Sequence, residues 1–170
     1  YFARFVPAPG AENEYRKLIR RLMALRSGGV LLSTLNYECL LDGEMTAAGL
    51  NVNYLFPPDG PTPLLKIHGS CNWYLDGAVD RGFNFTSGIR WEGQIRAFNS
   101  ADKVKAHFEG NKSLYPAICL YTADKPAPIC PTFFQHIQNE WTQQILGAKQ
   151  VALIGVRPYP KDTHIWGPLK

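Results

Sequence analysis

Three short polar clusters in this chain each follow a run of apolar residues, and each carries side chains that could do chemistry. The first contains Asn36, whose amide donates and accepts hydrogen bonds and can hold a water or a sugar hydroxyl. The second contains His68. An imidazole titrates near neutral pH and can take a proton from a water or a sugar hydroxyl. The third has Gly155 and then Arg157, where backbone N–H groups or the guanidinium could meet phosphate.

Each cluster also has an ordinary structural explanation. Asparagine after a strand most often makes an Asx turn or caps a helix. His68 is equally compatible with a hydrogen-bonded histidine in a tight turn, with Trp73 in the core, and the chain has four histidines. The turn at Gly155 lacks the full G-x-G-x-x-G pattern, and Arg157 could be a surface charge. Taken singly, none of the three clusters establishes a function.

The elements predicted around these clusters would bring them to one edge of a sheet. Apolar spacing predicts a helix over 12–26 that ends at a pair of glycines. Short apolar runs predict four buried strands, at 30–35, 64–67, 117–121 and 151–154. A helix should begin within 37–41, and a longer one should follow Thr132 as its cap. Alternating strands and helices predict a parallel α/β sheet with helices on both faces, whose ligands bind at the carboxyl ends of the strands.

The length and composition of the chain predict one globular domain. A chain of 170 residues can bury a packed core, and its 45% hydrophobic and 19% charged residues exclude a disordered protein. Residues 76–110 show no sustained period, so they predict an irregular insertion of small strands and turns, with a helix over 101–108. No apolar run reaches the roughly 20 residues that a membrane span needs.

Net charge and cysteine content further limit the class of protein and its partners. The net charge is +4, and its excess within 16–26 is explained by a solvated helix face, so direct nucleic-acid binding is not expected. A mildly basic surface would suit an anionic dinucleotide. The four cysteines form no CxxC pair, so neither a zinc ribbon nor another bound metal is expected. Scattered cysteines without a signal peptide are typical of a reduced, cytoplasmic protein.

The three clusters resemble the motifs of the SIR2-like (sirtuin-like) family. Thr34–Glu38 is similar to the family's T-x-N-Y-D segment, and Leu65–Trp73 is similar to its K-[LI]-H-G-S-x-N-W segment. Leu153–Val156 with Asp162–Ile165 is similar to the closing I-G-[YV]-S…D-x-H-I segment. The order and approximate spacing fit, and the histidine segment is the most specific of the three. The resemblance covers the chain from about 30 to 166.

This resemblance implies a Rossmann-like site with NAD+ as its substrate. The family's asparagine and histidine, which NAD turnover requires, fall on Asn36 and His68. The residues that the resemblance places around the nucleotide are Thr34, Tyr37, Glu38, Gly69, Ser70, Gly155, Val156 and Arg157. The missing zinc ribbon favours zinc-free bacterial relatives that deplete NAD in antiphage defence over protein deacylases. The implied function is therefore an NAD+ glycohydrolase, in a homo-oligomer or a larger defence complex.

Three departures from the family pattern keep other interpretations open. The family's glycine-rich first motif is absent, which predicts that the chain is a fragment of a longer protein. Glu38 stands where Asp is usual, and Arg157 stands where Ser is usual. A module that binds NAD or a derived nucleotide signal without cleaving it is therefore the first alternative. A structural or oligomerisation domain is the second.

Overall fold

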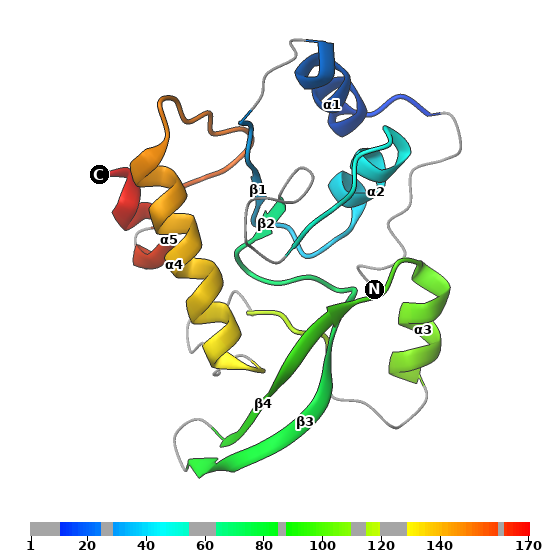
Figure 1. The fold of residues 1–170 in the computed structure, drawn as a ribbon, viewed down its shortest axis with the longest axis vertical. Coiled ribbons are helices and arrows are strands. Elements are labelled where there is room, and N and C mark those ends of the chain that lie inside the picture. The colour runs from blue at the N-terminus through cyan, green and yellow to red at the C-terminus, as the bar shows by residue number, and fades with distance from the viewer. Residues whose placement is uncertain are drawn as a thin grey trace.

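The chain folds as a mixed α/β structure with two small, separate sheets (Figure 1). The computed structural model describes residues 11–24, 29–54, 64–84, 88–109, 115–119, 129–159 and 162–170. The helices are α1 (Glu14–Ala24), α2 (Leu40–Ala47), α3 (Ala101–Glu109), α4 (Pro131–Gly147) and α5 (Thr163–Trp166), with a 3-10 turn η2 over Gly167–Leu169. The strands are β1 (Leu32–Thr34), β2 (Leu64–Lys66), β3 (Trp73–Asn84) and β4 (Gly88–Ala97). None of the helices described is long and apolar enough to cross a membrane.

The parallel pair of β1 and β2 is the part of the predicted sheet that the structure confirms. Leu32 lies opposite Leu64, and Thr34 lies opposite Lys66. In Figure 1 this pair lies between α1 and α2 on one side and α4 and α5 on the other. The carboxyl ends of both strands therefore meet at one edge, which is where polar loops can converge.

The prediction of a third buried strand over 117–121 is wrong for the residues that the structure describes there. Ile118 makes only an isolated antiparallel bridge to Gly69. Ala117 instead donates its N–H to the Trp73 carbonyl at 3.1 Å, and its own carbonyl accepts from Ser70 at 3.2 Å. These bonds bind the segment across the turn that follows β2, rather than alongside β2 as a further parallel strand.

The prediction of a fourth buried strand over 151–154 is also wrong. These residues have no ladder partner among the described strands, and the whole stretch 148–158 is exposed. Leu153 is 53% and Ile154 is 71% exposed. The apolar composition that suggested a buried strand is present, but none of the described strands pairs with the segment.

Residues 76–110 are more regular than the irregular insertion that was predicted. β3 and β4 form a long antiparallel hairpin, and α3 occupies the place of the predicted 101–108 helix. The register of the hairpin shifts between Asp76 and Val79 and again between Asp80 and Phe83. Each shift inverts which residues share a face, so the alternation that marks a strand is lost from the sequence.

Two apolar clusters hold the described elements together. The larger one includes Trp73 of β3 and three buried residues of α4, namely Phe134, Ile137 and Trp141. The smaller one joins Ile19 of α1 to Met45 of α2 and Leu64 of β2. α1 confirms the helix predicted over 12–26, of which residues 25 and 26 lie outside the described residues. The helix predicted after Thr132 is also confirmed, but Thr132 is not its cap, because α4 begins at Pro131 and Cys130 is in the capping position. The two clusters together place β2 between the helical layers.

Candidate functional site

The first two polar clusters lie side by side where β1 and β2 end. Asn36 and His68 stand at equal distances beyond the paired residues Thr34 and Lys66. The Cys71 N–H donates to the Tyr37 carbonyl at 2.8 Å, which joins the two loops directly. The rings of Tyr37 and His68 have centroids 6.3 Å apart. The strand register thus brings both segments to one edge, as the sequence predicted.

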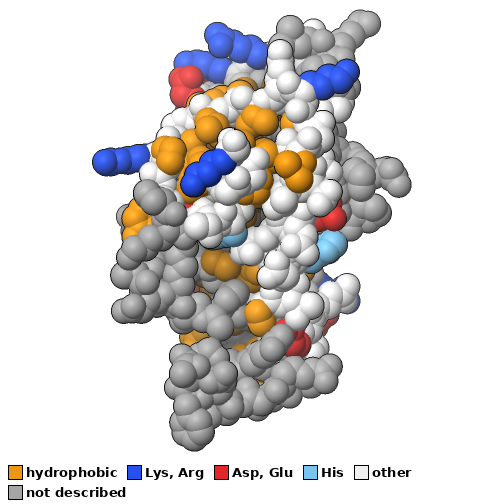
Figure 2. Space-filling view, turned by 90° about the vertical axis from the view of Figure 1, so that its left-hand side faces the viewer, with side chains coloured by type: hydrophobic (Ala, Val, Ile, Leu, Met, Phe, Trp, Pro, Cys, Tyr) orange, Lys and Arg blue, Asp and Glu red, His pale blue; other side chains and the backbone are white. Residues whose placement is uncertain are grey.

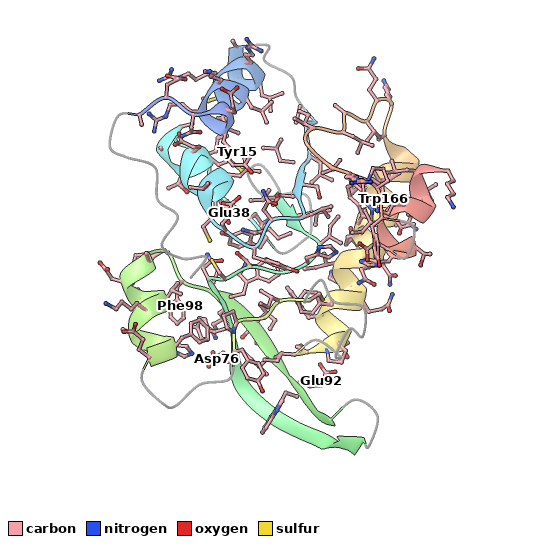
Figure 3. All side chains as sticks on the ribbon, turned by 180° about the vertical axis from the view of Figure 1, so that it is seen from behind. Tyr15, Glu38, Asp76, Glu92, Phe98 and Trp166 are labelled. Carbon is pink, nitrogen blue, oxygen red and sulfur yellow. The ribbon has the colours of Figure 1, made fainter. Side chains whose placement is uncertain are left out.

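The Asn36 side chain is exposed and is held by a small polar network. Its Nδ2 donates to the Tyr15 hydroxyl at 2.9 Å and to Glu38 Oε1 at 3.2 Å, while its backbone N–H donates to Thr34 Oγ1 at 3.1 Å. The Glu38 carboxylate also accepts from the Tyr15 hydroxyl at 3.3 Å and from the Leu40 N–H at the start of α2. Glu38 therefore orients Asn36. Tyr15 and Glu38 are labelled in Figure 3, where their side chains lie close together.

Tyr15 is a site residue that the sequence did not reveal. Its place on the apolar face of α1 predicted a core role, yet its hydroxyl contacts both Asn36 and Glu38. Burial, followed by the charge of Glu38, raises the pKa of the Tyr15 hydroxyl. The hydroxyl therefore stays protonated and can donate a hydrogen bond. No local signal could have found this contact, because 21 positions separate Tyr15 from Asn36.

The turn that carries His68 needs glycine at position 69. Gly69 has a φ of 83°, and a Cβ built there would lie 2.1 Å from the Ala117 carbonyl oxygen. The His68 carbonyl accepts from the Cys119 N–H at 2.8 Å, so both sides of the turn are fixed. His68 itself is only 5% exposed, so just a small part of its surface reaches solvent. Gly69 thus acts through backbone packing against 117–118.

Tyr37 and Ser70, which were also expected at the nucleotide, make contacts within the protein. The Tyr37 hydroxyl donates to the Cys119 carbonyl at 2.6 Å. Ser70 is fully buried and its Oγ lies 3.4 Å from the Tyr37 carbonyl. Both residues hold the two loops against 117–119, which is a positioning role.

A buried ion pair lies directly beneath the two loops. Lys66 Nζ is 3.2 and 3.3 Å from the carboxylate oxygens of Asp42 and donates to the Glu38 carbonyl at 2.5 Å. The Tyr54 hydroxyl donates to the same carboxylate. Burial first, and then the charge of Asp42, raises the pKa of that hydroxyl. Lys66 therefore links α2 to the loop of Asn36 from inside the protein.

Two cysteines, one from each loop, also meet here. Cys39 Sγ and Cys71 Sγ are 3.7 Å apart, and Cys39 Sγ lies 3.6 Å from Ser70 Oγ. The hydrogen bond from the Cys71 thiol lowers the pKa of Cys39, with the Lys66 charge acting in the same direction against burial. The thiolate at Cys39 is therefore favoured over one at Cys71, whose pKa is raised by the same contact.

The third cluster does not lie against the first two in the way that was expected. Gly155 has a φ of 65° with open space where a Cβ would be, Val156 is 38% exposed, and Arg157 is exposed. Figure 2 faces the side on which α4, α5 and this segment lie, and hydrophobic side chains gather there. Further along the same closing segment, however, the His164 ring lies 5.8 Å from the His68 ring.

A hollow in the described surface lies away from these loops. It is lined by residues of α4, namely Pro131, Thr132, Gln135, His136 and Asn139. None of them belongs to the three clusters. We therefore place the candidate site at the ends of β1 and β2. Comparison of the chain with known protein families, characterised proteins and solved structures found no match.

Proposed function

We propose that this chain is the catalytic part of an NAD+ glycohydrolase, which cleaves the bond between nicotinamide and ribose. The observation that carries the proposal is the parallel register of β1 and β2, with Thr34 opposite Lys66, because the loops of Asn36 and His68 then share one edge. The motif resemblance supplies the substrate, and the finer expectation of a Rossmann-like sheet belongs to the same proposal. By that resemblance the protein would act in the cytoplasm, as the NAD-depleting module of an antiphage complex.

The chemistry assigns different tasks to the two central residues. Loss of nicotinamide passes through a cation-like state at the ribose, which is favoured by fixed dipoles and by a base that prepares a water. His68 is that base, since an imidazole can accept a proton near neutral pH. Asn36 orients the water or the ribose hydroxyl with the part of its amide that Tyr15 and Glu38 leave facing solvent. Tyr15 and Glu38 are positioning residues that fix the amide.

Only 5% of His68 is exposed and its Nε2 atom is buried, so the imidazole would meet a single water or ribose hydroxyl and no bulk solvent. On the nucleotide side, the exposed backbone at Gly155 and the guanidinium of Arg157 would contact the adenosine ribose or the phosphates.

The test is release of nicotinamide from NAD+ by the purified chain, followed by chromatography. His68→Ala should lower the rate by roughly 10²- to 10⁴-fold, the usual contribution of a positioned base. Asn36→Ala should lower it as well. His136→Ala is the matched control, because this exposed histidine on α4 lies outside the site and its loss should leave the rate unchanged. Equal rates for wild type and His68→Ala would remove His68 from the mechanism.

A binding module that does not cleave NAD is the second candidate. It is favoured by the Glu38 carboxylate, which already accepts from Tyr15, Asn36 and the Leu40 N–H and so does not face a substrate. Calorimetric binding of NAD+ by the wild type without any nicotinamide release would support this candidate. The same experiment with Asn36→Ala then locates the bound nucleotide, since binding there should weaken.

A further inference from the structure

Two histidines and an aspartate from distant parts of the chain converge beside the candidate site. His68 follows β2, whereas Asp162 and His164 lie at the start of α5. One nitrogen of each imidazole and one oxygen of the carboxylate all lie within 4.8 Å of one another. His68 is 5% and Asp162 is 2% exposed, while His164 is partly exposed. The cluster is therefore mostly buried, with one member open to solvent.

Backbone hydrogen bonds fix both halves of this cluster. The Asp162 carbonyl accepts from Ile165 at 2.9 Å and from Trp166 at 3.0 Å, which forms the turn of α5. The Trp141 indole N–H donates to the Ile165 carbonyl at 3.3 Å and ties α5 to α4. On the other side, the His68 carbonyl accepts from Cys119. Both halves of the cluster are therefore held in place by hydrogen bonds to their backbone.

The donor set selects a class of metal ion. Imidazole nitrogen and carboxylate oxygen are ligands of Zn²⁺ and its first-row neighbours, whereas Mg²⁺ and Ca²⁺ prefer oxygen alone. Bonds of about 2.0–2.2 Å around a tetrahedral ion place its ligands roughly 3.3–3.6 Å apart. Ligand atoms within 4.8 Å thus need only a modest contraction to reach that geometry. Three protein ligands would leave a fourth position open to water.

We propose that His68, Asp162 and His164 form a binding site for a divalent first-row transition ion such as Zn²⁺. The sequence predicted no metal site because it has no CxxC pair, but this cluster uses histidines and an aspartate instead. A metal-bound imidazole cannot accept a proton, so the ion would inhibit nicotinamide release. This inhibitory role rests on the proposed function, whereas the metal site itself does not.

The metal site is tested with the metal-free full chain titrated with ZnCl₂ in a calorimeter, without NAD+. Wild type should bind one ion with micromolar or tighter affinity. Asp162→Asn and His164→Asn should each weaken binding by about 10-fold or more, since each removes or neutralises one ligand. His136→Ala should bind like wild type, because this exposed histidine lies on α4. Unchanged affinity in both ligand variants would overturn the proposal.

The nearby thiols require their own control. Cys39 and Cys71 could also bind Zn²⁺, since their sulfur atoms are 3.7 Å apart. Co²⁺ distinguishes the two sites, because thiolate ligands give a sulfur-to-cobalt charge-transfer band that nitrogen and oxygen ligands do not. We expect visible Co²⁺ bands without the sulfur band, and unchanged Zn²⁺ affinity in the Cys39→Ser/Cys71→Ser double variant. A sulfur band, or loss of binding in the double variant, would assign the ion to the cysteines and overturn the proposal.

Inhibition is a separate measurement with a separate outcome. Equimolar Zn²⁺ should abolish most of the nicotinamide release by wild type, and the chelator EDTA should restore it. His164→Asn should keep its release in the presence of the same Zn²⁺ concentration. If wild type binds Zn²⁺ but releases no nicotinamide in any condition, the proposed function fails and the metal site stands. If release is measurable and Zn²⁺ leaves it unchanged, the inhibitory role is overturned.

Discussion

The loops after β1 and β2 and the segment over 151–157 were all expected at one edge of a sheet, yet their environments are opposite. The two loops are joined by a backbone hydrogen bond between Cys71 and Tyr37 and lie on the buried ion pair of Lys66 and Asp42. The closing segment is exposed along its whole length and has no ladder partner among the described strands. A motif therefore has a defined geometry where buried polar contacts hold its backbone in place. Apolar composition alone does not provide such contacts.

The largest effect expected from breaking the loops is that of Lys66→Met. The substitution leaves Asp42 buried without its cation, which typically costs about 3–5 kcal/mol of unfolding free energy. Urea denaturation followed by circular dichroism measures the loss. Lys105→Met is the control, because Lys105 is exposed on α3 and should change stability by less than about 0.5 kcal/mol. Similar losses in both variants would mean that the ion pair does not hold the loops.

Gly69→Ala should have the next largest effect. A methyl group there meets the Ala117 carbonyl at 2.1 Å and requires a positive φ, so we expect a loss of roughly 2–4 kcal/mol. The same denaturation experiment measures it. Gly43→Ala is the matched control within α2, where a Cβ meets nothing within 4 Å and the change should stabilise by about 0.5–1 kcal/mol. Equal stability of Gly69→Ala and Gly43→Ala would contradict the close packing of the turn at Gly69 against Ala117.

A pH-dependent test addresses the packing of α1, which supplies Tyr15 to the site. Arg16 donates to Glu44 at 2.7 Å, and this hydrogen bond lowers the pKa of the Glu44 carboxyl. A carboxyl whose pKa is lower in the folded than in the unfolded state stabilises the fold at pH values above its ordinary pKa of about 4.3. That stabilisation is lost as the pH falls through the folded-state pKa. Glu44→Gln should therefore be less stable than wild type at pH 7, with the difference shrinking below about pH 4. A difference independent of pH would contradict the charge contribution.

The contact between the two loops can be read from the reactivity of one thiol. The hydrogen bond from Cys71 lowers the pKa of Cys39, so Cys71→Ala should raise that pKa and slow alkylation of Cys39 near neutral pH. Iodoacetamide labelling followed by peptide mass spectrometry measures the rate. Cys119→Ala is the control, because Cys119 makes no thiol contact with Cys39 in the structure and the Cys39 rate should not change. Equal rates of Cys39 alkylation in Cys71→Ala and in the wild type would mean that the Cys71 thiol does not act on Cys39, against the contact between the two loops.

The smallest effect belongs to the closing segment. Ile154→Ser should change the unfolding free energy by less than about 0.5 kcal/mol, because the side chain is 71% exposed. Ile67→Ser is the contrast, since Ile67 is 1% exposed in the larger core cluster and its loss should cost several times more. Denaturation midpoints of both variants give the comparison. A large loss in Ile154→Ser would mean that the segment is packed in solution.

The sequence predicted elements whose signal is local and missed contacts that are not. Apolar spacing located α1 and α4, and short apolar runs located β1 and β2. The same rule failed over 151–154, because a run of apolar residues indicates the capacity for burial and says nothing about whether a partner strand is present. The hairpin of β3 and β4 was missed because its register shifts interrupt the alternation.

The candidate site was predictable to a similar extent. Asn36 and His68 could be placed at one sheet edge from their positions after two apolar runs. The contacts of Tyr15 with Asn36, and of His164 with His68, depend on tertiary packing and have no local pattern. Gly69 was expected around the nucleotide, and in the structure its lack of a side chain admits the backbone at Ala117. The glycine at position 69 indicated that the backbone there is constrained, whereas only the fold shows that Ala117 is what packs against it.

The exposed segment Val151–Val156 also bears on how copies of the chain could associate at high concentration. Six consecutive residues without charge, most of them β-branched or aliphatic, are the kind of stretch through which copies stack into intermolecular strands. Lys149 and Arg157 stand at its two ends, where like charges on neighbouring copies repel. Charge repulsion from Lys149 and Arg157 would oppose such stacking.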